Sequence, residues 1–153
     1  MTERFVLRTD GGARGNPGPA GAGIVLISPS GDVVRSGGRF LGAATNNVAE
    51  YAALLWGLSV AAECGVRRLE VRADSELVVR QMNGHYRVRN AGLVPLHAEA
   101  TQLLARFESV RIVHVRREEN AAADALANAA MDERGHVGDA GGTGSDGTPR
   151  LFE

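Results

Sequence analysis

The sequence predicts an α/β domain in which helices pack against a mixed β-sheet. Two observations support this prediction: the first third of the chain has the pattern of three strands joined by turns, and the remainder alternates helical and strand-like segments. At 153 residues, the chain is long enough for one domain with a substantial hydrophobic core.

The three N-terminal strands follow one another closely. Residues 4–10 alternate between apolar and polar side chains and end at Asp10, after which the stretch GGARGNPGPAG is typical of a turn. A second strand is predicted near residues 22–27 and a third at about 33–40, with residues 29–32 as the hairpin turn between them.

The period then changes to that of a helix. Thr45 or Asn46 is placed to cap its N-terminus, and Gly65 ends it. Its apolar face consists of Val48, Ala52, Leu55, Leu58 and Ala62.

A fourth strand follows, because Leu69, Val71 and Ala73 alternate with polar residues. A short helix is expected after Asp74, with Ser75 as its cap. These two elements repeat the helix-then-strand order expected of an α/β fold.

The remaining elements are predicted in the same way. Residues 84–93 form a loop, and Pro95 lies in the first turn of the next helix. Residues 110–115 are a fifth strand, and a final helix runs from near Asn120 to about Met131.

The C-terminal segment differs in composition. From residue 134 onward, glycine and aspartate dominate and apolar residues are almost absent, which predicts disorder. We therefore divide the chain into a domain at residues 1–133 and a disordered Gly/Asp-rich tail at residues 134–153.

Composition argues against several classes of protein. The single cysteine, Cys64, permits no internal disulfide, and no Cys/His spacing indicates zinc. The longest apolar stretch, residues 48–62, is too short to span a membrane, and the N-terminus lacks the pattern of a secretory signal. We expect a cytoplasmic protein that does not bind membranes.

The charge is balanced but unevenly distributed. The net charge is −1, and all 17 basic residues are arginine. The last nineteen residues contain three acids and one arginine, a net of −2, so residues 1–134 carry +1. Arginine suits a nucleic-acid partner because it binds phosphate bidentately, although a GC-rich genome would also favour arginine codons.

Four acids stand where a strand or helix meets a turn: Asp10 in TDGG, Glu50 in TNNVAEY, Asp74 in VRADSEL and Asp124 in AAADALA. Each alone has an ordinary structural explanation, such as capping or interaction with a helix dipole. If the fold brings all four together, cations must offset their repulsion, and Mg²⁺ prefers carboxylate and water oxygens. The set therefore indicates a divalent-metal site.

With these motifs in this order, the chain resembles the type 1 ribonuclease H family, particularly bacterial and archaeal members that lack a basic handle. The resemblance runs from about Phe5 to about Asp132 and includes TNN before the second acid and DS at the third. It implies a ribonuclease H-like fold, with a five-stranded mixed sheet, helices on both faces, and strands 1, 4 and 5 parallel.

The resemblance also implies an activity. Members of the family are endonucleases that hydrolyse the RNA strand of RNA–DNA hybrids with two Mg²⁺ ions, leaving 5′-phosphate and 3′-hydroxyl ends; Mn²⁺ is an alternative ion. By this resemblance, Asp10 bridges both ions, Glu50 and Asp74 favour the first, and Asp124 favours the second. We expect a monomeric enzyme that binds an RNA–DNA hybrid.

Neighbours of the acids resemble the substrate contacts of the family. Asn46 and Asn47 match the pair that reads base edges and sugars in the minor groove, and Thr45 and Asn16 match a pocket for a DNA-strand phosphate. Gly11 lets the backbone approach a sugar-phosphate chain.

Several positions depart from the family pattern. The family's loop histidine is absent, and Arg117 in the short stretch RREEN is the closest substitute for its catalytic role. His114 is expected to pack on the preceding strand. Glu76 replaces a frequent glutamine and is predicted to contact a 2′-hydroxyl. Because the loop at residues 84–93 has no lysine- and tryptophan-rich helix, weaker and salt-sensitive hybrid binding is expected.

Two other functions are compatible with the same scaffold. One is a non-catalytic module that binds hybrids or duplexes, since a fold alone does not determine function. The other is a different metal-dependent enzyme such as a DNA nuclease. The intact set of four acids argues against the first, and the TNN and DS contexts argue against the second.

Overall fold

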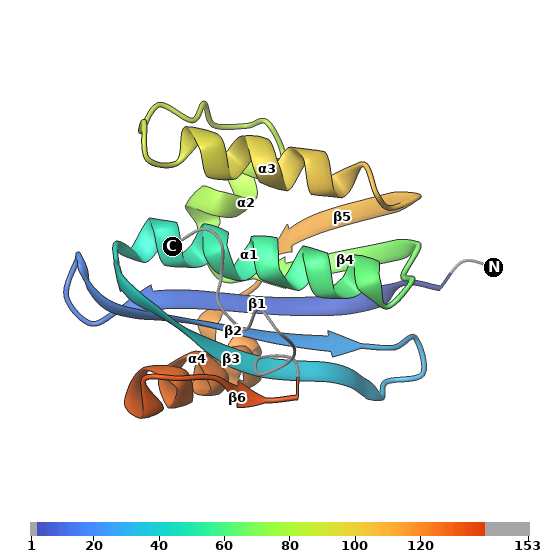
Figure 1. Ribbon diagram of the computed structural model, residues 1–153. Helices are drawn as coiled ribbons and strands as arrows, with labels where there is room; N and C mark the ends of the chain where they lie inside the picture. The colour runs from blue at the N-terminus through green and yellow to red at the C-terminus, as the bar shows by residue number, and fades with distance from the viewer. Residues whose placement is uncertain (1–2, 140–153) are drawn as a thin grey trace.

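A mixed β-sheet of six strands forms the centre of the computed structural model, which describes residues 3–139 (Figure 1). In chain order these strands are β1 (Phe5–Ala13), β2 (Gly18–Ile27), β3 (Val33–Ala44), β4 (Arg68–Ala73), β5 (Ser109–His114) and β6 (Val137–Gly138). Within the sheet they lie in the order β5-β4-β1-β2-β3-β6.

Helices pack on both faces of this sheet (Figure 1). They are α1 (Asn46–Glu63), α2 (Glu76–Met82), α3 (Val94–Leu104), the short 3₁₀ helix η1 (Arg117–Asn120) and α4 (Ala121–Glu133). α1 covers β1 and β2 on one face with α3 beside it, and α4 packs against β1, β2 and β3 from the other face. The predicted mixed sheet with helices on both faces is confirmed.

The pairing of β1 determines where a site can form. β1 pairs antiparallel with β2 and parallel with β4, which itself pairs parallel with β5, as the resemblance implied. β4 is the shorter strand: its last residue, Ala73, pairs with Thr9. Residues 10–13 of β1 therefore extend beyond β4, and this edge of the strand is open to side chains from other elements.

The C-terminal part of the domain differs from expectation. We expected five strands and disorder from residue 134, whereas Val137 and Gly138 form β6 and pair with Gly38 and Gly37 of β3. A strand of two residues has too little periodicity to be recognised in a sequence. Residues 140–153 of the expected tail lie outside the described residues.

Capping residues begin the helices where the sequence predicted. Thr45, rather than Asn46, is the N-cap of α1, and its hydroxyl accepts a hydrogen bond from the N–H of Val48 at 3.2 Å. Ser75 caps α2 by accepting from the N–H of Val78 at 3.3 Å. These caps fix the points at which both helices begin, at the same end of the sheet.

Two glycines let helices approach the sheet closely from opposite faces. A Cβ at Gly11 would lie 2.1 Å from the carbonyl oxygen of Ala49 in α1, and a Cβ at Gly23 would lie 2.0 Å from that of Ala123 in α4. Glycine is required at both positions because any side chain would displace the helix. Gly23 pairs with Asp10 in the sheet. The close packing at the two glycines therefore brings Glu50, which follows Ala49, and Asp124, which follows Ala123, near Asp10.

The hydrophobic core lies mainly between α1 and the sheet. Trp56, predicted to be a core residue, is only 8% exposed, and Tyr51 is fully buried with its hydroxyl 2.6 Å from Oε1 of Gln81. Cys64 is half-buried at the end of α1. Between residues 3 and 139, none of the helices has both the length and the apolar character that crossing a bilayer requires.

Candidate metal and active site

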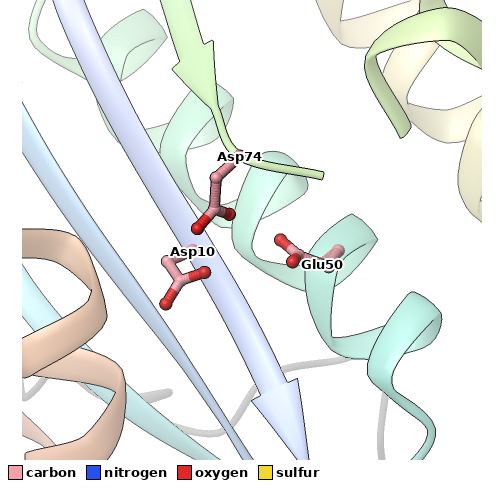
Figure 2. A group of neighbouring side chains, drawn as sticks. All are labelled: Asp10, Glu50 and Asp74. Carbon is pink, nitrogen blue, oxygen red and sulfur yellow. The ribbon is translucent and has the colours of Figure 1, made fainter. Parts of the chain in front are cut away.

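Three carboxylates meet where β1 extends past the end of β4. Asp10 lies on β1, Glu50 lies near the start of α1, and Asp74 directly follows β4. Each can offer one oxygen such that the three oxygens lie within 4.8 Å of one another. Figure 2 shows the three carboxylates converging from these separate elements.

The backbone of β1 holds Glu50 in place. Oε1 of Glu50 accepts a hydrogen bond from the N–H of Gly11 at 3.2 Å. Gly11 lies beyond Thr9, the last residue of β1 that pairs with β4, so its N–H is free to bind a side chain. The first turns of α1 thereby bring a carboxylate to the open edge of the strand.

Asp124 completes the cluster from the other face of the sheet. It lies in the first turn of α4, close enough for its carboxyl group to help raise the pKa of Asp10. All four acids line one cavity of about 370 Å³. The structure therefore brings together the four acids that the sequence analysis selected.

Without cations, the cluster is electrostatically unfavourable. Burial, followed by the charges of Glu50 and Asp74, raises the pKa of Asp10 to about 9. Burial, followed by the charge of Asp74, raises the pKa of Glu50 to about 8, although the N–H of Gly11 and the guanidinium of Arg117 favour its charged form. A cation in the cavity would stabilise the ionised form of both groups.

The donor set fits hard divalent ions. Oxygen ligands are those that Mg²⁺ and Mn²⁺ prefer, and the cavity is large enough for the water molecules that Mg²⁺ retains. Within the described part of the chain, neither cysteine nor histidine lines the cavity, so the softer ligands typical of zinc are missing there.

Arg117, the predicted substitute for a loop histidine, also lines the cavity. It lies at the start of η1, and its charge acts on Glu50 as described above. The expectation for His114 is wrong: this residue is exposed rather than packed. It is the last residue of β5, an edge strand, so no neighbouring strand covers it on one side.

Two of the predicted substrate contacts, Gly11 and Asn46, line the cavity. Oδ1 of Asn46 accepts a hydrogen bond from the N–H of Ala13 at 2.8 Å, and the N–H of Asn46 donates to Oδ1 of Asn16 at 3.0 Å. Asn16 and Thr45 lie outside the cavity lining. This network joins the β1–β2 turn to the start of α1.

The remaining predicted contacts lie further away. Asn47 and Glu76 are exposed and do not line the cavity. Oε2 of Glu76 forms an ion pair with Nε of Arg80, at 2.8 Å, one turn along α2. Contacts of Asn47 and Glu76 with a substrate stay predictions.

Three polar residues at the site were missed in the sequence. Arg14 and Asn128 line the cavity. Asn120 is fully buried and donates from Nδ2 to the carbonyl oxygen of Thr9 at 2.8 Å, which ties the start of α4 to β1. Asn120 and Asn128 each lie four residues from Asp124, a helical spacing that could have indicated them. Only the tertiary structure places Arg14 beside α4.

Comparisons with known proteins show which family this chain resembles. The chain matches the family model described as reverse transcriptase-like over residues 8–130. It is 46% identical over 124 residues to ribonuclease HI of Halobacterium salinarum, which covers 81% of this chain and 62% of that protein. It is 42% identical over 130 residues to the bifunctional protein Rv2228c of Mycobacterium tuberculosis, covering 84% of this chain and 36% of that protein. The chain thus spans less than two thirds of either relative.

Solved structures share the fold. RNase H1 from the halophilic archaeon Halobacterium salinarum NRC-1 superposes with a TM-score of 0.83 at 45% identity, covering 85% of this chain and 98% of that one. LC11-RNase H1, solved in complex with an RNA/DNA hybrid, has a TM-score of 0.82 at 40% identity and covers 86% of this chain and 99% of that one.

Proposed function

This chain belongs to the type 1 ribonuclease H family, and from that membership we propose that it is a metal-dependent endonuclease that hydrolyses the RNA strand of RNA–DNA hybrids. The observation that carries the proposal is the convergence of four carboxylates, from β1, α1, the end of β4 and α4, on one cavity. A protein that only binds nucleic acid gains nothing from such a cluster, because the negative charge of the four carboxylates repels the phosphates of the ligand.

Two divalent ions, Mg²⁺ or alternatively Mn²⁺, would activate the attacking water and stabilise the departing 3′ oxygen. Asp10 is the proposed shared ligand, because its carboxyl group has the other three acids around it. Glu50 and Asp74 would hold the first ion, since their oxygens and one of Asp10 lie within 4.8 Å of one another. Asp124 would hold the second ion from the opposite side.

The other residues of the cavity have proposed roles of binding and charge balance. Arg117 keeps a positive charge near Glu50, which favours the ionised form that a metal ion requires. Asn46, fixed by the backbone of Ala13, would present its amide to the minor groove of the hybrid, with Asn47 beside it in sequence. Asn16 and Thr45 would contact a phosphate of the DNA strand. A cytoplasmic location and a monomeric state stay predictions.

A cleavage assay tests the proposed function. The purified protein should cut the labelled RNA strand of a hybrid in the presence of Mg²⁺ and should not cut it in the presence of EDTA. The products should carry 5′-phosphate and 3′-hydroxyl ends, so they should ligate without prior phosphorylation. Double-stranded RNA and double-stranded DNA of the same sequence are the controls. Equal cleavage of DNA would favour the DNA nuclease, and tight hybrid binding without cleavage would favour the non-catalytic module.

A further inference from the structure

Arg14 lies at the rim of the cavity and is held there by α4. It directly follows β1, and its backbone N–H donates to the carbonyl oxygen of Pro19 at 2.8 Å, which closes the β1–β2 turn. Its Nη1 lies 2.8 Å from Oδ1 of Asp132, and its Nη2 lies 3.2 Å from Oδ1 of Asn128. The guanidinium group therefore has a defined position although it is half exposed.

The side chains that hold Arg14 continue the face of α4 that carries Asp124. Asp124, Asn128 and Asp132 are spaced four residues apart and lie on one side of the helix. Nδ2 of Asn128 donates to the carbonyl oxygen of Asp124 at 3.0 Å, which turns Oδ1 of Asn128 toward Arg14. At about 1.5 Å of helix per residue, Asp132 lies roughly 12 Å along the axis from Asp124.

The contact between Arg14 and Asp132 contributes little to stability. Their side chains are 47% and 66% exposed, and exposed ion pairs typically contribute about 0–1 kcal/mol. Within the described residues, Nε of Arg14 has no protein acceptor, so part of the guanidinium fork is free. A phosphate can bind this fork bidentately and can replace Asp132 at small cost.

The charge distribution of the cavity favours such a ligand. Two arginines line the cavity in the described chain, Arg14 and Arg117. The positive charge of Arg117 favours the ionised form of Glu50. Arg14 instead pairs with Asp132, which lies outside the cavity lining. Asn128 and Asp132, which hold Arg14, lie about one and two helical turns beyond Asp124, so the guanidinium is placed for a phosphate next to the reacting one.

We propose that Arg14, oriented by Asn128 and released from Asp132 when substrate binds, forms a phosphate subsite for the cut strand next to the scissile linkage. This inference rests on the proposed function and adds a residue that binds the substrate without acting on the reacting atoms. Its consequence is that Arg14 contributes to substrate affinity and to its salt dependence, and not to the chemical step.

Steady-state cleavage of a hybrid at several salt concentrations tests the subsite. Arg14→Gln should raise KM roughly 5- to 10-fold with kcat within about twofold, and the slope of log(1/KM) against log salt concentration should become shallower by about 1. Arg14→Lys should keep the slope and lose part of the affinity, because it retains the charge and loses the fork. A modified hybrid, in which one neutral methylphosphonate replaces the RNA linkage that Arg14 contacts, should bind the parent protein less tightly than the unmodified hybrid does. The Arg14→Gln variant should bind the modified and unmodified hybrids equally well.

Two control variants separate binding from structure. Arg35→Gln removes the same charge from an exposed position on β3, at the end of the sheet remote from the cavity, and should leave KM and its salt slope unchanged. Asp132→Asn frees Arg14 and should leave KM unchanged or lower it. The subsite is overturned if Arg14→Gln behaves like Arg35→Gln, or if Asp132→Asn raises KM as much as Arg14→Gln does. A parent protein that does not cut hybrids would instead overturn the proposed function, so the two failures are distinguishable.

Discussion

Replacing Asp10 with asparagine should abolish cleavage of the RNA strand while leaving the fold intact. Asp10 has Glu50, Asp74 and Asp124 around it, so its carboxylate is the one positioned to share both of the proposed metal ions. Asparagine has the same shape but lacks the charge. We expect the rate to fall by at least about 1000-fold, which corresponds to roughly 4 kcal/mol of transition-state stabilisation.

Single-turnover cleavage of a labelled hybrid measures this effect. Asp32→Asn is the matched control, because Asp32 is an exposed aspartate in the turn between β2 and β3 and should retain the parental rate. The metal-free Asp10→Asn variant should melt at a temperature at least as high as the parent, since the substitution removes one of four clustered charges. A variant that cuts hybrids at the parental rate would contradict the assignment of Asp10.

In the absence of metal, the protein should become less stable as the pH rises from about 4 to about 9. The pKa of Asp10 is raised to about 9 and that of Glu50 to about 8, chiefly by burial. In the unfolded chain both groups titrate near pH 4. Between these limits the folded protein binds more protons than the unfolded chain, so the free energy of unfolding falls with increasing pH.

Thermal melts in EDTA and in Mg²⁺ at pH 5.5, 7 and 8.5 measure this effect. In EDTA the melting temperature should fall across the series, and Asp10→Asn should show a flatter profile than the parent. Mg²⁺ at about 100 times its Kd contributes about 2.7 kcal/mol, or on the order of 10 °C, and its effect should be largest at pH 8.5. A parent whose melting temperature does not depend on Mg²⁺ at any of these pH values would argue against a metal site.

The sequence predicted the order of the elements and the four acids, because both depend on local patterns. Apolar periodicity identified the order of β1 to β5 and of α1 to α4, and Ser75 identified the start of α2. The glycine-rich segment predicted as a turn instead contributes residues 11–13 to β1 and residues 18–21 to β2. The acids were recognisable because each stands in a distinctive local motif, although Asp10 lies within β1 and Glu50 within α1 rather than at the boundary of the element. These features depend on residues close to one another in the chain, which a sequence displays directly.

The parts that could not be predicted depend on tertiary contacts. In the sequence, nothing distinguishes Gly23 from other glycines in strands, and only the fold shows that Ala123 of α4 packs against it. Arg14 and Asp132 are distant in the chain, so their ion pair has no local signal. The exposure of His114 follows from the position of β5 at the edge of the sheet, which strand alternation does not reveal.

The central claim is that the four carboxylates bind two divalent ions at one place, and anomalous scattering from manganese tests it most directly. Crystals grown with Mn²⁺ and a hybrid, or its cleavage product, should show two anomalous peaks about 3.5–4 Å apart. Both peaks should contact oxygens of Asp10, with Glu50 and Asp74 at one ion and Asp124 at the other. A cavity without anomalous density at saturating Mn²⁺, or peaks bound only by residues outside this cluster, would contradict the account.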